Sequence, residues 1–159
     1  MIFLTVGSQK FQFDRLIKKI DGLIENGIIT DTIFAQIGYS NYKPQHMEYV
    51  AFLNSTNFYQ HLNESDIVIT HGGTGVIVNA IKKGKKVIAI PRLKEYGEHV
   101  DNHQIELIKQ FEELNLIEPV YDLNKIEIAF DKVKNTTYDQ YVSNTESIIS
   151  SIVDFIESN

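Results

Sequence analysis

A histidine, three glycines and a threonine follow a short apolar run near the middle of the chain. Ile67 to Ile69 form the run, and His71-Gly72-Gly73-Thr74-Gly75 stands before helix-compatible sequence resumes at Val76. Glycine lets the main chain approach a ligand closely, and the N-terminus of a helix offers unpaired N–H groups and the positive end of its dipole. The segment therefore predicts an anion-binding turn, and a phosphate group is the expected ligand.

Two common phosphate-binding motifs do not fit this segment. A dinucleotide fingerprint requires G-x-G-x-x-G, whereas Gly73-Thr74-Gly75 is followed by valine, isoleucine and valine. A P-loop would need glycine at Asn79 and serine or threonine at Lys86. The turn is therefore expected to bind a phosphate of another kind of ligand.

Polar residues gather again after a strand that ends at Pro91. Asp101, Asn102, His103 and Gln104 stand where a helix is expected to begin, and a plain N-terminal cap is one interpretation of them. His99, Asp101 and His103 resemble metal ligands, but alternating positions suit ligation on a strand rather than on a loop entering a helix. Because the sequence also has no Asp-x-Asp pair, we expect no metal and no other cofactor.

Hydrophobic spacing predicts that strands and helices alternate along the chain. Such alternation indicates an α/β fold: a single Rossmann-like domain with a mainly parallel sheet and helices on both faces. The loops at Gly7, Gly38, His71 and Pro91 should then share one rim, beyond the carboxyl ends of the strands. The expected strands are residues 2–6, 32–37, 47–53, 67–69, 87–90 and 117–120, and the expected helices are residues 13–24, 54–62, a segment from 76, 102–114, 124–134 and 139–157.

Length and composition limit the classes of protein that fit. The 159 residues, 43% of them hydrophobic, suffice for one domain spanning 1–159. A formal charge of -6 argues against nucleic acid as a partner. The absence of cysteine excludes disulfides and zinc–thiolate sites and favours the cytoplasm. The chain starts on a strand rather than a signal peptide, and no apolar run approaches the ~20 residues of a membrane span.

Four segments, in their order along the chain, carry a family resemblance. They resemble the C-terminal, nucleotide-sugar-binding half of the GT-B glycosyltransferases of family 28. Within that family the chain is most similar to the free-standing type, the small catalytic subunit of two-part UDP-sugar transferases of lipid-linked oligosaccharide and bacterial capsule or exopolysaccharide synthesis. The matching segments are Thr5-Val6-Gly7-Ser8 with Phe13-Asp14, Gln36-Ile37-Gly38-Tyr39-Ser40, His71-Gly72-Gly73-Thr74-Gly75, and Pro91 with Asp101-Asn102-His103-Gln104.

The resemblance implies a site and a reaction. It implies inverting transfer of a hexose, galactose or N-acetylglucosamine, from a UDP-sugar without a required metal. His71 would be the catalytic residue, and Gln104 would contact the donor directly. The donor-binding set is Gly7, Ser8, Gly72, Gly73, Thr74, Gly75, Asn79, Pro91, Asp101, Asn102, His103 and Gln104.

Two positions depart from the family pattern. Many members carry threonine after the last glycine of the turn and glutamate three residues later, where the acid holds the ribose hydroxyls. This chain has Val76 and Asn79 there. A neutral amide forms a weaker bond to a hydroxyl than a carboxylate does, so ribose binding through Asn79 stays an open expectation.

A GT-B enzyme closes two Rossmann-like halves around its substrates, and 159 residues suffice for one half. The resemblance therefore implies a membrane-associated second subunit that holds a lipid-linked saccharide acceptor and recruits this chain to the inner face of the cell membrane. Two alternatives are a non-catalytic nucleotide-sugar-binding regulatory subunit and a UDP-sugar epimerase or hydrolase of GT-B type. Around the site, Glu95 and Glu98 are expected to be solvated, and Tyr39 and Tyr42 to pack in their loop or contact a partner.

Overall fold

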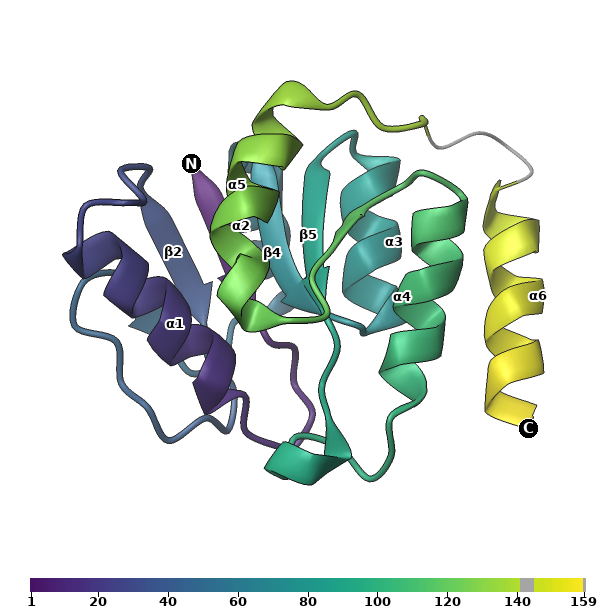
Figure 1. The fold of residues 1–159 in the computed structure, drawn as a ribbon, viewed down its shortest axis with the longest axis horizontal. Coiled ribbons are helices and arrows are strands. Elements are labelled where there is room, and N and C mark those ends of the chain that lie inside the picture. The colour runs from purple at the N-terminus through teal and green to yellow at the C-terminus, as the bar shows by residue number, and fades with distance from the viewer. Residues whose placement is uncertain (141–144, 159) are drawn as a thin grey trace.

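The computed structural model describes residues 1–140 and 145–158, and it contains one parallel sheet (Figure 1). Within these residues six strands pair in the order β3-β2-β1-β4-β5-β6. Strand β1 lies between β2 and β4, so that Ile2 pairs with Ile33 on one side and Ile67 on the other. The strands are β1 (Ile2–Thr5), β2 (Ile33–Gln36), β3 (Glu48–Val50), β4 (Ile67–His71), β5 (Lys86–Ile90) and β6 (Glu118–Pro119).

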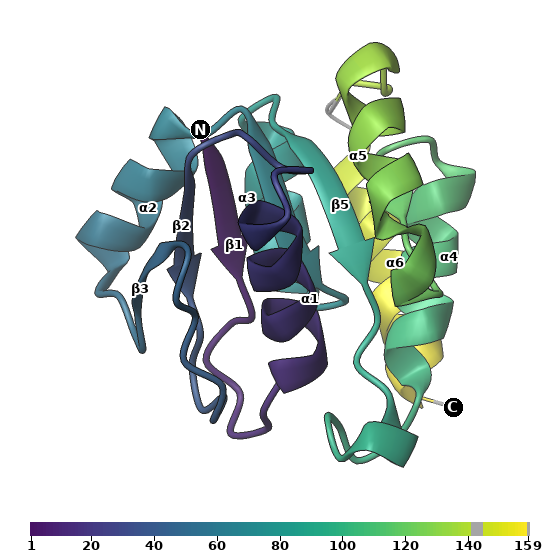
Figure 2. The ribbon, with the colours of Figure 1, turned by 60° about the vertical axis from the view of Figure 1, so that its left-hand side comes forward.

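Helices cover both faces of the sheet, as the alternation of elements predicts (Figure 2). Helices α1 and α5 pack on one face, and α2, α3 and α4 pack on the other, with α6 outside α4. The helices are α1 (Asp14–Glu25), α2 (Ser55–Glu64), α3 (Thr74–Lys82), α4 (His103–Glu113), α5 (Ile126–Asn135) and α6 (Thr145–Ser158), with short 3₁₀ turns η1 (Lys94–Tyr96) and η2 (Leu123–Lys125).

Two apolar layers result from the side-chain alternation of the central strands. Ile2 and Leu4 of β1 pack with α1 and α5, whereas Phe3 packs with α2 and α3. Because successive residues of a strand point to opposite faces, a strand buried on both sides must be apolar throughout. This requirement explains the continuous apolar runs within β1, β4 and β5, which form the buried centre of the sheet.

Most expected elements are present, with differences at their ends. Helix α2 begins after Asn54, whose side chain accepts a hydrogen bond from the Asn57 N–H, as an N-cap residue should. Strand β3 is three residues long, shorter than the expected 47–53, and it lies largely exposed at the edge of the sheet. Asp139, where the last helix was expected to begin, lies instead in the segment before α6, and residues 141–144 fall outside the described part of the chain.

The strand order reverses between β1 and β4, which places a crevice at their carboxyl ends. The strand arrows point toward the lower edge of Figure 1, where the loops after them lie. Among the described residues, no helix combines the length and apolar character needed to cross a membrane.

Candidate functional site

His71 ends β4 and lies wedged between two glycine-bearing loops. Its side chain is only 3% exposed. A Cβ atom on Gly73 would stand 2.2 Å from His71 Cε1, and one on Gly7 would stand 2.7 Å from His71 Nε2. Both positions therefore require glycine because the imidazole ring occupies the space of a side chain. The histidine joins the β1–α1 loop to the β4–α3 turn.

Gln104, in the first turn of α4, links the ends of β4 and β5. Its Oε1 accepts hydrogen bonds from the Gly72 N–H at 3.0 Å and the Arg92 N–H at 2.9 Å, and its Nε2 lies 3.3 Å from His71 Nδ1. Gly72 allows this approach, since a Cβ there would stand 2.7 Å from Gln104 Cβ. The side chain expected to contact the donor is thus buried, with both ends of its amide bonded within the protein.

These bonds fix which ring nitrogen of His71 carries the hydrogen, and burial keeps the ring neutral. Because Gln104 Oε1 accepts from two N–H groups, its Nε2 donates to His71 Nδ1, and the imidazole hydrogen is on Nε2. Burial, with a smaller contribution from the charge of Arg92, lowers the pKa of His71 to about 3. The imidazole is therefore neutral near pH 7. It can donate a hydrogen bond from Nε2, but it adds no positive charge to the site.

The N-terminus of α3 is open for an anion. Gly73 is the N-cap residue and provides no side-chain cap for the helix. First-turn N–H groups have no acceptor within their own helix, so those of Thr74 and Gly75 are available to a ligand. Gly75 is exposed, and a Cβ added there would meet nothing within 4 Å. Asn79 lies further along α3, partly exposed.

The four loops expected on one rim are found together there. Gly7 adopts φ 76°, and the neighbouring Ser8 is exposed. Gly38 adopts φ 56°, and a Cβ on it would lie 3.0 Å from the Gly7 carbonyl oxygen. Pro91 directly follows β5 and precedes Arg92, and Gln104 Oε1 accepts hydrogen bonds from the Arg92 and Gly72 N–H groups. Gly7, His71 and Gln104, which belong to the segments after β1, β4 and β5, are therefore brought to one place.

Asp101 and His103 form a separate cluster with His99 at the start of α4. The Asp101 carboxylate accepts from the His103 N–H at 3.1 Å, contacts His103 Nδ1, and lies 3.2 Å from His99 Nδ1. The hydrogen bonds from His103 lower the pKa of Asp101. The expectation that alternating positions suit ligation only on a strand is wrong in its geometry, because the possible ligand atoms of these three side chains lie within 4.8 Å of one another on a loop that enters a helix. The helix-cap interpretation of Asp101 agrees with its bond to the His103 N–H. Asn102 Oδ1 accepts from the Lys94 N–H at 2.8 Å.

Two charged residues, Arg92 and Glu98, are buried beneath the loops, and the sequence interpretation includes no role for Arg92. Arg92 is fully buried. Glu98 was expected to be solvated, and this is wrong: its side chain is 0% exposed and is bonded to Arg15. Glu95 is exposed, as expected. A sequence signal for Arg92 was its place directly after the buried end of β5, where a cation requires acceptors inside the protein.

The loop after β2 is held by two aspartates of α1. Asp14 Oδ1 accepts from the Asn41 and Tyr42 N–H groups at 2.7 and 2.8 Å. Asp21 accepts from the Tyr42 hydroxyl at 2.7 Å, which agrees with a packing role for that tyrosine. Tyr39 is 54% exposed and stacks edge-on against Phe52.

A groove of about 760 Å³ runs along α1, η1 and the segment from 121 to 127. Lys18, Lys19 and Gly22 of α1 form one wall, and Tyr121 and Glu127 form the other. The lining includes none of the glycines of the rim. We therefore place the candidate site at the glycine loops, where close backbone approach and open N–H groups coincide.

Comparison with known proteins places this geometry in a family. The model of the glycosyltransferase family 28 C-terminal domain matches residues 1–158. The chain belongs to this family. The matched residues include all the loops of the rim. The family match and the site formed by Gly7, His71 and Gln104 therefore lie in the same part of the chain.

Two curated relatives show how far the likeness extends. The Candida albicans UDP-N-acetylglucosamine transferase subunit ALG13 is 35% identical over 78 residues, which are 49% of this chain and 25% of that protein. The human UDP-N-acetylglucosamine transferase subunit ALG13 is 29% identical over 123 residues, which are 69% of this chain and 10% of that protein. This family 28 chain thus spans a minor part of each relative.

Solved structures confirm the fold class. The NMR structure of ALG13 covers 98% of this chain and 96% of its own, with a TM-score of 0.63 and 16% identity. The glycotransferase of kitacinnamycin covers 99% of this chain and 39% of its own, with a TM-score of 0.63 and 14% identity. At these identities the likeness shows the fold alone, a Rossmann-like domain of the kind found in GT-B enzymes.

Proposed function

We propose that this family 28 chain is the donor-binding, catalytic subunit of a two-part inverting glycosyltransferase. It binds a UDP-sugar at the glycine rim and transfers the hexose to a lipid-linked saccharide. One observation carries the proposal: the loops after β1, β4 and β5 meet at His71 and Gln104, beside the open N-terminus of α3. A diphosphate is the ligand that such backbone N–H groups and a helix dipole recognise.

The leaving group is the diphosphate of UDP, on which negative charge grows as the bond to the sugar breaks. The Thr74 and Gly75 N–H groups and the α3 dipole stabilise that charge, and His71 Nε2–H supplies a neutral donor near Gly7 and Gly73. These donors need no metal to act. Deprotonation of the acceptor hydroxyl requires a general base, which the proposal assigns to the partner's side of the cleft.

The relatives support the choice of donor and partner. Their names describe subunits of UDP-N-acetylglucosamine transferases, so UDP-N-acetylglucosamine is the first donor to test, and UDP-galactose, favoured by the capsule-type resemblance, is the second. The word subunit supports a second polypeptide. In the proposal this partner is associated with the inner face of the membrane, presents the lipid-linked acceptor and recruits a cytoplasmic chain to it.

The binding test uses two helical glycines with equally open surroundings. A Cβ on Gly75 or on Gly22 of α1 would meet nothing within 4 Å, so Gly75→Ala and Gly22→Ala should both fold. If the diphosphate lies at Gly75, the added methyl group stands between it and the backbone. Calorimetry should show UDP binding weakened by about tenfold or more in Gly75→Ala, a change of ~1.4 kcal/mol or more, and unchanged in Gly22→Ala. Equal affinities in both variants would contradict the placement of the donor.

The activity test separates transfer from its alternatives. Each UDP-sugar is incubated with the chain alone and with a candidate membrane partner plus a glycosyl-pyrophosphoryl lipid. Transfer only in the complete mixture supports the proposal. UDP release or an epimer from the donor alone would indicate a hydrolase or epimerase instead. Full transfer by a Gly75→Ala complex that no longer binds UDP would make this chain a regulatory subunit.

A further inference from the structure

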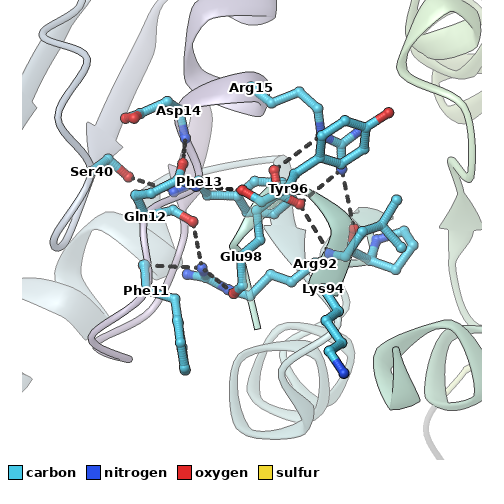
Figure 3. A network of polar contacts seen from close by, with 12 residues as sticks. Phe11, Gln12, Phe13, Asp14, Arg15, Ser40, Arg92, Lys94, Tyr96 and Glu98 are labelled. Carbon is cyan, nitrogen blue, oxygen red and sulfur yellow. Dashed lines mark hydrogen bonds and ion pairs between the residues drawn. The ribbon is translucent and has the colours of Figure 1, made fainter. Parts of the chain in front are cut away.

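We propose that Arg92, Glu98 and Arg15 are positioning residues that fix the spacing between the β1–α1 and β5–α4 loops. The proposal rests on the proposed function, because these two loops flank the donor site. Figure 3 shows the three side chains between the loops. None of them lines the glycine turn, so they would act on the donor through the backbone that they hold.

Arg92 holds the β1–α1 loop through hydrogen bonds to its backbone. Its guanidinium donates to the backbone carbonyls of Val6, Phe11 and Gln12, and the last two bonds are each 3.1 Å long. It also donates to the carbonyl of Glu98 at 3.3 Å. A buried cation bonded to carbonyls at both ends of one loop fixes its path, because each carbonyl would otherwise lose a partner.

Glu98 holds the β5–α4 loop through bonds to Arg15 and to the Leu93 N–H. Its two carboxylate oxygens each lie 3.0 Å from an Arg15 nitrogen, in the bidentate arrangement that gives both strength and direction. One of them also accepts from the Leu93 N–H at 3.0 Å. Arg15 in turn lies against the Tyr96 ring, 4.6 Å from its centroid. The η1 turn is thereby fixed to the start of α1.

Stability alone is a poor reason for such a network. Replacing a buried ion pair by apolar residues is often neutral or stabilising, so the proposal assigns this network to fixing one geometry rather than to stability. Here the joined loops carry Ser8 on one side and the Asp101–His103 cluster on the other. A fixed spacing between them sets the width available to a diphosphate and sugar.

The test uses Glu98→Gln. A substitution of Arg92 would leave four buried backbone carbonyls without their hydrogen-bond donor and could prevent folding. Glutamine keeps the shape and an acceptor for the Leu93 N–H, but it loses the charge and one acceptor for Arg15. Val133→Ala, in the buried core of α5, is the control for a general loss of stability. Arg15→Lys keeps the charge without the bidentate geometry.

Amide hydrogen exchange gives a measurement that does not depend on the ligand. We expect the amides of residues 8–12 and 93–98 to exchange faster in Glu98→Gln than in Val133→Ala, when both are compared at equal distance below their melting temperatures. Equal exchange in the two variants would overturn the positioning role, whether or not the chain binds UDP.

Binding and kinetics then connect the spacing to function. For Glu98→Gln we expect UDP affinity about tenfold weaker than wild type, and a kcat/KM with the partner lower by on the order of 100-fold, the scale of a 1 Å misplacement. Arg15→Lys should fall between wild type and Glu98→Gln, and Val133→Ala should keep wild-type affinity. If the loss of UDP affinity in the three variants were proportional to the loss of melting temperature, the proposal would be overturned. Failure of wild type to bind UDP would instead refute the proposed function, and hydrogen exchange would still decide the positioning role.

Discussion

At the scale of single residues, His71 explains the glycines around it. Its ring fills the space beside Gly7 and Gly73, and Gln104 fixes the ring through Nδ1. A sequence motif of histidine and glycines is usually explained by the ligand alone. Here the same residues also satisfy each other, because the imidazole needs two neighbours without side chains. Packing and ligand binding therefore make the same demand on these positions.

The neutral state of His71 predicts a pH dependence of stability. Its pKa is about 3 in the folded chain against 6.5 ordinarily, so below pH 6.5 the unfolded chain binds a proton that the folded chain does not. Stability present above pH 6.5 is therefore lost as the pH falls toward 3. We expect the free energy of unfolding to drop by about 1.6 kcal/mol between pH 6.5 and pH 5, because the unfolded imidazole is already half protonated at pH 6.5.

Urea denaturation across this range measures that loss. His71→Asn removes the titrating group and keeps a polar side chain, so its stability should vary less with pH than that of wild type. Burial and the neighbouring His103 lower the pKa of His99 as well, so His99 adds a residual loss in the same direction. An unchanged pH slope in His71→Asn would contradict the assignment to His71.

Two glycines of the same turn should respond oppositely to alanine. In Gly73→Ala the new methyl group overlaps the His71 ring, so we expect a loss of about 1–3 kcal/mol in the free energy of unfolding. In Gly75→Ala it meets nothing, and alanine favours the helix by up to about 1 kcal/mol. Thermal unfolding of the two variants side by side gives the comparison. Equal destabilisation would show that His71 does not occupy the position described.

At the scale of elements, helix α1 organises the loop after β2. Asp21 is buried, and its carboxylate accepts from the Tyr42 hydroxyl and from the Gln45 and His46 N–H groups. Burial alone would raise the pKa of Asp21, but these hydrogen bonds outweigh it and the pKa is lowered. One carboxylate thus substitutes for the regular backbone bonds that an irregular loop lacks.

Removing this carboxylate should loosen the loop. Asp21→Ala leaves three donors without their acceptor, and we expect a loss of about 2–3 kcal/mol in the free energy of unfolding. Tyr42→Phe removes one donor and should cost about 1 kcal/mol. Tyr39→Phe, on an exposed side chain, should stay within about 0.5 kcal/mol of wild type. Chemical denaturation gives this ranking, and a Tyr42→Phe loss equal to that of Asp21→Ala would refute it.

The elements themselves could be predicted because each central strand contains an unbroken apolar run and each main helix has a regular apolar face. The pairing of the strands could not be predicted, since nothing in the sequence of β4 states that β1 and β5 are its neighbours. The functions of Gln104 and Arg92 depend on that pairing. The family resemblance predicts a donor contact for Gln104, whereas its bonds to Gly72 and Arg92 exist only because β4 and β5 end side by side.

At the scale of the whole molecule, the rim provides only one side of a binding cleft. The loops of Gly7, His71 and Pro91 all belong to the carboxyl edge of one sheet, and the proposed function places the acceptor on the opposite side of a cleft. A sugar transfer needs groups on both sides of the reacting carbon, since the acceptor hydroxyl attacks opposite to the leaving diphosphate. A single rim can bind the sugar donor and stabilise the leaving diphosphate, but it cannot also hold the acceptor on the opposite side.

This one-sidedness predicts that UDP binding and sugar transfer separate. The chain alone should bind UDP, whereas its transfer to a glycosyl-pyrophosphoryl lipid should be at least about 100-fold slower than with the partner, the scale set by loss of one transition-state contact. A radiolabelled UDP-sugar assay with increasing partner should rise to a plateau at equal amounts of the two subunits. The Gly22→Ala chain should reach the same plateau, and the Gly75→Ala chain should need more donor. Full transfer by the chain alone would place both sides of the reaction on this one rim and refute the division of labour.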